Sequence, residues 1–373
     1  MDMMPTLQKL KLRSIAKGQV LIKAGDTDRI AYFIVDGAFK VIRDIEGMTR
    51  RVYYCLPGDW VGEIALLRKK PRTASVIAIQ PSIVIGLDET ILDSLSIPSQ
   101  LEIYKKLSEL AATRINTMNE ELTEVYRQID SDVRDAAKYL ESLLPPRITD
   151  GTVKADWCFL PCRRLGGDAF EYFWLDKDLF AVYLMDVCGH GVKAALFSST
   201  IFNTIHTGRS RGIDLSSPGH VLTSLSELFG VDPHDFMYFS IWYGVYDQGK
   251  RQLHYASAGH PPALLWHGDT STGCQLQPLS TPGACIGLSQ NVSYEASTVD
   301  VPPASQLILY TDGVYELIRD DGSMWTREEF LEVMSRQLES SHFTLDWFLN
   351  YAGHLQGQWN FMDDFTLLQI LFE

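Results

Sequence analysis

The spacing of apolar and polar positions changes twice along the chain and predicts three regions. Between residues 12 and 87, short apolar runs alternate with turns rich in glycine, proline and aspartate, such as Pro57-Gly58-Asp59. Turn signals about ten residues apart are typical of an antiparallel β-barrel or sandwich. We therefore predict a small β-domain over residues 1–96.

The second region, residues 97–144, lacks glycine and is rich in charged residues. Apolar positions recur there at steps of mostly three and four, which predicts one long helix with a heptad seam that slips at Asp132. Such a helix needs a partner for its apolar edge, so we expect residues 97–144 to form a parallel homodimer. The alternative is that the stripe packs on the chain's own domains. The seam positions are Ala111, Ile115, Met118, Leu122, Val125, Ile129, Ala136, Leu140 and Leu143.

The third region, residues 145–373, begins where Pro145-Pro146 ends the helix. Strand-like runs alternate with fewer helical ones, which predicts antiparallel sheet with helices packed outside it. The whole chain is thus predicted to be a multidomain α+β protein. Strands are expected at Phe180–Met185, Phe236–Tyr246, Gln252–Ser257, Ala263–His267, Gln306–Tyr310 and Phe365–Phe372, and helices at Val192–Thr207, Gly219–Phe229, Arg327–Gln337 and Thr344–Gln358.

Aspartates stand at several strand ends of this third region. A hairpin predicted over residues 169–185 would bring Asp168 and Asp186 together at one end of the sheet. Asp312 follows another strand-like run, and Asp363-Asp364 precedes the last one. Carboxylates gathered in this way favour hard divalent cations with oxygen ligands, so the pattern predicts a metal centre.

The β-domain contains a candidate phosphate site, Gly62-Glu63-Ile64-Ala65-Leu66-Leu67 followed by Pro71-Arg72-Thr73-Ala74-Ser75. A glycine at a helix start offers free N–H groups to a phosphate, and an arginine can bind phosphate with two hydrogen bonds. Through this segment residues 12–96 resemble cyclic nucleotide-binding domains, which are β-rolls. The resemblance implies that Glu63 holds the ribose 2′-hydroxyl and Arg72 the cyclic phosphate of cyclic AMP or cyclic GMP. It also implies that Gly62, Ile64, Ala65 and Thr73 line the site.

Five motifs in the third region occur in a family's order. They are Leu165-Gly166-Gly167-Asp168, Asp186-Val187-Cys188-Gly189-His190-Gly191, Ala258-Gly259-His260-Pro261-Pro262, Tyr310-Thr311-Asp312-Gly313 and Asp363-Asp364-Phe365-Thr366. Through them, residues from about 135 to 373 resemble the SpoIIE-like bacterial serine phosphatases, a branch of the metal-dependent type 2C protein phosphatases. The resemblance implies an α/β/β/α sandwich domain.

The same resemblance implies two Mn²⁺ or Mg²⁺ ions and assigns their ligands. Asp186 would bridge the ions beside the carbonyl of Val187, Asp168 and Asp312 would hold one ion, and Asp363 would complete the set. Hydrolysis of a phosphomonoester near neutral pH needs a hydroxide nucleophile and neutralised phosphoryl oxygens, and two metal ions about 4 Å apart supply both. Asp168 and Asp186 are therefore the residues on which catalysis is expected to depend.

Other residues of these motifs leave alternatives open. The family usually has aspartate where this chain has Glu171, and the longer acid could still hydrogen-bond a metal-bound water. His190 is either a general acid or a turn residue. His260 is expected to be a structural part of a turn. Arg163 and Arg164 either meet a substrate phosphate or remain solvated.

Composition narrows the function classes. The net charge of −14 argues against nucleic acid as a partner, because phosphate binding needs a basic face. No apolar run approaches the ~20 residues that span a bilayer, and the N-terminus lacks the pattern of a secretory signal. The six cysteines include no Cys-x-x-Cys pair, which favours a reducing, cytoplasmic compartment.

These observations predict a metal-dependent protein serine/threonine phosphatase regulated by a cyclic nucleotide. Its substrate would be a regulatory phosphoprotein, and the resemblance implies an anti-sigma-factor antagonist of the STAS type. The alternative is a non-catalytic cyclic-nucleotide sensor that uses a phosphatase fold as its output. A nucleotide-responsive transcription factor is excluded, because an acidic domain of over two hundred residues stands where a basic helix-turn-helix would follow.

Overall fold

The computed structural model describes residues 11–45, 48–68, 71–231, 236–268, 275–290, 292–319, 321–340, 343–357, 359 and 361–373. The chain forms two compact units, Met1–Gln128 and Ile129–Glu373. None of the described helices combines the length and the apolar character needed to cross a bilayer.

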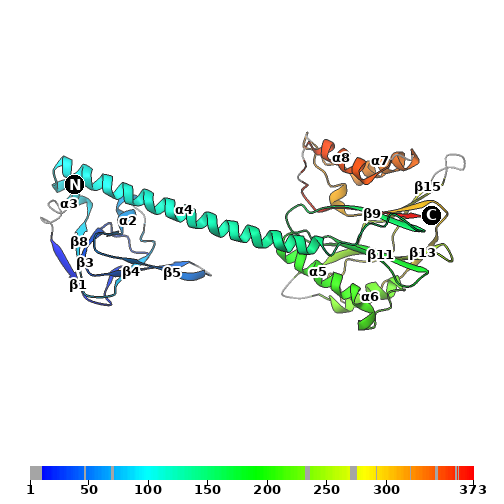
Figure 1. Cartoon of the computed structure of the whole chain (residues 1–373), viewed down its shortest axis with the longest axis horizontal. Helices are drawn as coiled ribbons and strands as arrows, with labels where there is room; N and C mark the ends of the chain where they lie inside the picture. The colour runs from blue at the N-terminus through cyan, green and yellow to red at the C-terminus, as the bar shows by residue number, and fades with distance from the viewer. Residues whose placement is uncertain are drawn as a thin grey trace. The chain divides into compact units, whose positions relative to one another are not determined.

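The first unit is built on two four-stranded antiparallel sheets (Figure 1). Their strand orders are β1-β8-β3-β6 and β2-β7-β4-β5, as the turn spacing predicted for a β-domain. Gly37, at the β3–β4 turn, has φ +95°, and a Cβ there would lie 2.1 Å from the Ser82 hydroxyl, so only glycine fits. The strands are β1 (Leu12–Ile15), β2 (Val20–Ile22), β3 (Ala31–Asp36), β4 (Phe39–Ile45), β5 (Met48–Cys55), β6 (Trp60–Val61), β7 (Ser75–Ala78) and β8 (Ser82–Leu87), and the short helices are α2 (Glu63–Arg68) and α3 (Glu89–Ser94).

The glycine-free segment forms the single helix α4 (Ile97–Glu141), which ends before the predicted Leu144. Its first turns belong to the first unit, where Ile103 and Leu107 are buried with Trp60 and Leu92. Further along, the seam residues Ile115, Met118, Leu122 and Val125 are 47–57% exposed. Within the described residues this part of the apolar edge is therefore poorly covered.

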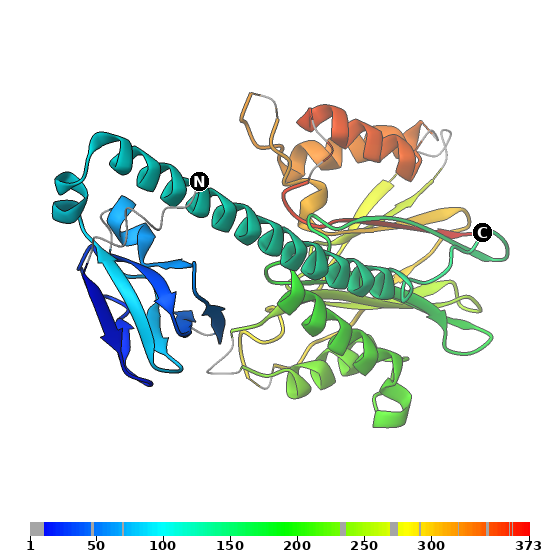
Figure 2. The same cartoon turned by 60° about the vertical axis from the view of Figure 1, so that its left-hand side comes forward.

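The second unit has four layers, two five-stranded antiparallel sheets between two pairs of helices (Figures 1 and 2). Helices α5 (Val192–His206) and α6 (Pro218–Leu228) cover the sheet β10-β11-β12-β13-β16, and α7 (Arg327–Glu339) and α8 (Leu345–Gln356) cover the sheet β15-β14-β17-β18-β9. This is the predicted α/β/β/α sandwich. The strands are β9 (Val153–Leu160), β10 (Ala169–Trp174), β11 (Leu179–Val187), β12 (Phe239–Asp247), β13 (Gln252–Ala258), β14 (Ala263–His267), β15 (Gln275–Leu279), β16 (Ser297–Asp300), β17 (Ser305–Tyr310) and β18 (Phe365–Phe372).

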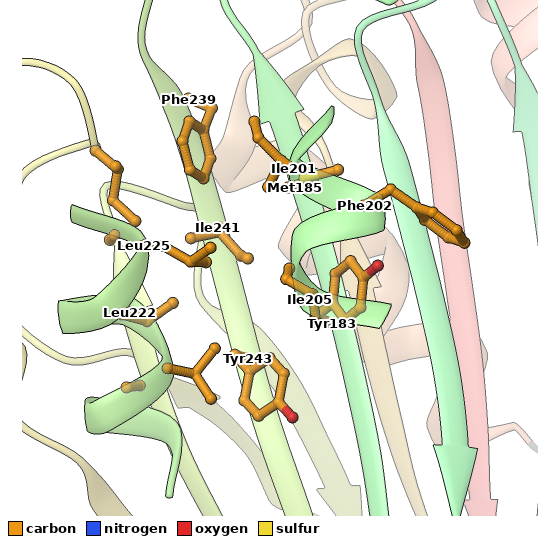
Figure 3. Packing of buried hydrophobic residues seen from close by; sticks show 14 of the residues in the cluster. Tyr183, Met185, Ile201, Phe202, Ile205, Leu222, Leu225, Phe239, Ile241 and Tyr243 are labelled. Atoms are coloured by element: carbon orange, nitrogen blue, oxygen red, sulfur yellow. The ribbon is translucent and has the colours of Figure 1, made fainter. Parts of the chain in front are cut away.

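The faces of β11 show how packing positions the acidic residues. Met185 packs under α5 and α6, together with residues such as Ile201 and Leu225 (Figure 3). Val187 belongs to the same cluster. Leu184 belongs instead to the core between the two sheets. Because side chains alternate along a strand, Asp186 shares this inner face with Leu184. The apolar pattern of the strand thus directs the Asp186 carboxylate into the space between the sheets.

Most predicted strands and helices of the second unit are present with boundaries shifted by no more than a few residues. Strands β9, β15 and β16 were not predicted from the sequence. All three are edge strands of the two sheets of this unit. The predicted helix Thr344–Gln358 begins at its cap Thr344, whose hydroxyl accepts from Trp347 N–H, while Gln358 lies outside the described residues.

Candidate functional site

Two strand pairs bring the predicted aspartates to one region of the second unit. Antiparallel pairing sets Ala169 opposite Met185, so that Asp168 and Asp186 meet at the same end of the β10–β11 hairpin, within hydrogen-bonding reach. In the other sheet Tyr310 pairs with Leu367, which brings the end of β17 beside the start of β18. Asp312 and Asp363 extend from these two ends. The ends of these four strands therefore bring together aspartates from four positions in the sequence, which form an acidic cluster.

A pocket of about 480 Å³ opens at this cluster. Asp186, Val187, Asp312 and Asp363 are among the residues that line it. Asp168 is buried behind them, and one of its oxygens accepts hydrogen bonds from the Thr311 hydroxyl (2.9 Å) and from the Thr366 hydroxyl. Asp186, Asp312 and Asp363 thus share one pocket, and Asp168 lies next to Asp186 with its carboxylate held by two threonines.

Burial and mutual repulsion raise the pKa values of the acidic residues of the pocket. Burial, and then the nearby Asp312, Asp363 and Asp364, raise the pKa of Asp186 to about 7. Burial and the charge of Asp363 raise the pKa of Asp312 to about 6, and burial together with Asp186 raises the pKa of Asp168 well above its usual value. Carboxylates gathered without a compensating cation fit divalent metal ions, whose charge would favour the ionised forms.

The two adjacent aspartates of the last motif have different surroundings. Asp363 lines the pocket, whereas Asp364 is buried and accepts backbone hydrogen bonds from Cys162 (2.8 Å), Gly167 (2.5 Å) and Asp168 (3.3 Å). A Cβ on Gly166 would lie 2.5 Å from the Asp364 carboxylate, so the glycine of that motif permits this close approach. Asp364 therefore fixes the loop that carries Asp168.

One further group of potential ligands lies beside this loop. Cys162, Asp363 and Asp364 have ligand atoms within 4.8 Å of one another. Burial and the charge of Asp364 raise the pKa of the Cys162 thiol to about 12. Because metals bind the thiolate, this cysteine is a poor ligand near neutral pH.

The remaining motif residues are placed as follows. Glu171 points away from the pocket, since its carboxylate accepts from Tyr183 Oη (3.2 Å) and meets His206 Nδ1 (2.8 Å). His190 is exposed, and His260 is buried and lines the pocket. The possibility that Glu171 hydrogen-bonds a metal-bound water has no support from this arrangement, because Tyr183 and His206 occupy the carboxylate.

His260 has an unusual environment for a turn residue. Its Nδ1 lies 3.0 Å from the Pro261 carbonyl, so Nδ1 carries the proton and Nε2 is an acceptor. Burial lowers the pKa of His260 to about 4, which keeps the ring neutral. Nε2 is buried and has no partner among the described residues, and the same holds for the hydroxyl of Ser240 in the same pocket. Two of the residues that line the pocket thus each carry a buried polar atom without a hydrogen-bond partner among the described residues.

Arg163 and Arg164 are both exposed, as the second alternative expects. Arg164 forms an ion pair with Asp130 of α4 (2.5 Å), Arg163 is exposed, and the pocket lining includes neither of them. Arg327 and Tyr315 line the pocket instead, together with Ser240, and the sequence analysis missed all three. No motif marks them, because the fold of the β17–α7 segment alone brings Arg327 and Tyr315 to the acidic cluster.

The first unit has a separate pocket at the predicted nucleotide site. Glu63, at the start of α2, and Arg72 line it with Gly62, Ile64 and Thr73, while the side chain of Ala65 lies outside the described part of the chain. These residues are therefore brought together as the resemblance implied for all but Ala65.

Both charged side chains of this pocket already have partners. Arg72 pairs with Asp28 (2.5 Å) and donates to the carbonyls of Gly62 (2.9 Å) and Ile30 (2.6 Å). Glu63 is buried, and one of its oxygens pairs with Arg114 of α4, which also lines the pocket. The second oxygen of Glu63 has no partner among the described residues. An unpaired buried acceptor fits a ligand that donates a hydroxyl.

Comparisons with known proteins assign a family to the segment around each pocket. The family model of stage II sporulation protein E (SpoIIE) matches residues 176–373, more than half of the chain, and that of the cyclic nucleotide-binding domain matches residues 12–96. The chain therefore belongs to the SpoIIE family and carries a cyclic nucleotide-binding domain before its family domain.

Named relatives and a solved structure are similar to parts or most of the chain. Phosphoserine phosphatase RsbP of Bacillus subtilis (strain 168) is 27% identical over 56% of this chain and 54% of its own length. Phosphoserine phosphatase RsbU of the same organism is 24% identical over 78% of this chain and 86% of its own length. The SiaA-PP2C domain of Pseudomonas aeruginosa has the same fold, with a TM-score of 0.56 and 21% identity over 67% of this chain and 99% of that domain.

Proposed function

We propose that the chain is a metal-dependent protein serine phosphatase whose activity is regulated by a cyclic nucleotide. One observation carries the proposal: Asp186, Asp312 and Asp363 line one pocket, with Asp168 behind them, and burial and mutual repulsion raise the pKa values of these carboxylates. Ionised together, they need cations. The named relatives RsbP and RsbU, which are phosphoserine phosphatases, support the reaction class.

The donor set fits Mn²⁺ or Mg²⁺, since it consists of carboxylates and a backbone carbonyl. Asp186 would hold both ions with the carbonyl of Val187 beside it, and Asp363 would complete the set. Asp312 would hold one ion together with Asp168, which would offer the oxygen that the threonines leave open. Two such ions supply an activated water and neutralise phosphoryl charge. Asp364 keeps Asp168 in position through the backbone of its loop.

The substrate we propose is a phosphoserine or phosphothreonine of a regulatory phosphoprotein. The pocket is open and large enough to admit a phosphorylated side chain. An anti-sigma-factor antagonist of the STAS type is the specific substrate that the family resemblance supports.

The proposed regulator is cyclic AMP or cyclic GMP, bound by Glu63 and Arg72. Because Arg114 of α4 pairs with Glu63, a ribose hydroxyl that takes Glu63 as its acceptor would change the environment of α4. The ligand would thus act on the helix that continues toward the family domain. The exposed seam of α4 supports a parallel homodimer over residues 97–144.

The test is hydrolysis of a phosphoseryl peptide by the full chain with Mn²⁺, with and without each nucleotide. We expect turnover that changes with one nucleotide and that falls to background in Asp186→Ala. Asp178→Ala removes a carboxylate from the exposed turn of the same hairpin and should behave as wild type. Turnover unaffected by Asp186→Ala would contradict the proposed metal centre, and turnover unaffected by either nucleotide would contradict the regulation.

A further inference from the structure

Most of the charged residues that line the acidic pocket are negative. Asp186, Asp312 and Asp363 contribute carboxylates, and Arg327 contributes the one positive charge among the described lining residues, since burial keeps His260 neutral. A phosphorylated side chain carries two negative charges near neutral pH. Without bound cations it would be repelled by these carboxylates, and among the described lining residues Arg327 alone offers a side-chain positive charge to it.

Helix stability does not explain the position of Arg327. It is the first residue of α7, where the helix dipole disfavours a cation. The capping box of Thr326 and Glu329, with the acidic Glu328 beside it, already satisfies this helix start. The arginine is thus placed where it costs the helix stability, at the edge of the acidic pocket.

The guanidinium of Arg327 is also not used in an internal ion pair. Among the described residues no carboxylate pairs with it, and its Nε is buried without a hydrogen-bond partner. The neighbouring Arg319 pairs with Glu329 (2.6 Å), and Arg336 of the same helix pairs with Glu332 (3.4 Å). Arg327 therefore differs from Arg319 and Arg336 in having no carboxylate partner among the described residues.

The neighbours of Arg327 connect it to the acidic cluster. It interacts with the phenol groups of Tyr310 and Tyr315. Burial and then the charge of Asp312 raise the pKa of Tyr315, so Tyr315 lies near this proposed ligand. Tyr310 is the last residue of β17, the strand that leads to Asp312. The strand and the two tyrosines thus hold Arg327 beside the carboxylate end of the pocket.

We propose that Arg327 binds the phosphoryl group of the substrate, through oxygens that face away from the carboxylates. A guanidinium presents a planar fork of donors that matches two phosphoryl oxygens, and it stays charged at any physiological pH. Arg327 is then the residue that selects and orients the phosphoryl group. This inference rests on the proposed phosphatase function.

The test uses the full chain loaded with Mn²⁺ and compares Arg327→Gln, Arg327→Lys and Arg336→Gln. The last variant removes the same charge from the same helix, but outside the pocket. Calorimetry measures the affinity for inorganic phosphate, and steady-state kinetics measures KM and kcat for a small phosphomonoester and for a phosphoseryl peptide. Thermal unfolding reports whether each variant is folded.

We expect Arg327→Gln to weaken phosphate binding about 10–100-fold, the range for losing a charged hydrogen bond. KM should rise for both substrates, Arg327→Lys should recover part of the loss, and Arg336→Gln should match wild type. The unfolding midpoint of Arg327→Gln should be unchanged or higher, because a cation leaves a helix N-terminus.

Three results would overturn the inference in distinguishable ways. Unchanged phosphate affinity and KM in Arg327→Gln, with an active wild type, would remove Arg327 from the site and leave the phosphatase proposal intact. A defect limited to the phosphoseryl peptide would assign Arg327 to other parts of the substrate. A wild type that neither binds phosphate nor hydrolyses either substrate would contradict the proposed function itself.

Discussion

The two pockets of this chain handle charge in opposite ways. At the nucleotide pocket Arg72 and Glu63 are both paired inside the protein, with Asp28 and Arg114. At the acidic pocket Asp186 and Asp312 face other carboxylates, and no described cation pairs with them. A ligand of the first pocket must therefore exchange partners with existing groups, which suits a switch. A ligand of the second supplies missing charge, which suits a metal centre.

The largest effects are expected at the acidic pocket, where Asp186→Asn should abolish turnover and yet stabilise the metal-free protein. The substitution removes a buried charge that other carboxylates repel. At pH 8 we expect the unfolding midpoint to rise by a few degrees, on the order of 1–2 kcal/mol. Asp364→Asn is the matched comparison, since it weakens an acceptor of three backbone N–H groups and should cost about 2 kcal/mol. Destabilisation by both variants would argue against the charge imbalance.

The same imbalance predicts the pH dependence of the metal-free chain. The pKa values of Asp186 and Asp312 are raised from 3.8 to about 7 and about 6, so the folded state retains protons that the unfolded state has released. Stability should therefore fall as pH rises from about 4 to about 7. Denaturant unfolding across this range, with Asp186→Asn as the control, measures the contribution. A wild-type profile that the variant reproduces would contradict it.

At the nucleotide pocket, the next largest effect is expected from loss of Arg72, and it should appear in the affinity for the nucleotide. Arg72→Gln should weaken affinity for cyclic AMP or cyclic GMP about 10–100-fold, because a charge-assisted contact to the phosphate is lost. Calorimetry with each nucleotide measures this. Arg13→Gln is a suitable control, because it removes a charge from the same unit outside the pocket lining. Equal affinity in Arg72→Gln and wild type would exclude the proposed phosphate contact.

A smaller effect on affinity, but a clear one on regulation, is expected for Arg114→Gln. Without Arg114 the nucleotide still has Glu63 and Arg72, so its affinity should change by less than about tenfold. The difference in turnover between the free and nucleotide-bound protein should nevertheless disappear. The comparison of both quantities in one variant separates binding from coupling. Retention of the full regulatory difference would show that Arg114 does not carry the signal.

The sequence predicted the positions of the four aspartates, which depend on strand pairing and on where the strands end. Asp168 and Asp186 lie together because residues 169 and 185 pair, and Asp312 and Asp363 lie together because β17 and β18 are neighbours. The β10–β11 hairpin and the long helix follow from local patterns that a single sequence displays. The pairing of β17 with β18 joins distant segments, and the sandwich was implied by the resemblance to SpoIIE-like phosphatases.

Two placements were not predicted from the sequence, each for a physical reason. Glu171 was considered as a neighbour of a metal-bound water, but its odd offset of three residues from Asp168 places it on the opposite face of β10, toward Tyr183 and α5. Strand alternation could have indicated this. Arg327 and Ser240 could not have been found in the same way, because their positions depend on packing between segments distant in the sequence.

The most direct test of the account is Mn²⁺ calorimetry on the full chain, at pH 6 and pH 8 in buffers of different ionisation enthalpy. We predict two bound ions, with protons released at pH 6 and fewer at pH 8, because the metal displaces protons held by the carboxylates of raised pKa. Asp186→Ala should lose the binding. A wild type that binds no Mn²⁺, or binds it without releasing protons at pH 6, would contradict the assignment of this pocket as a metal centre.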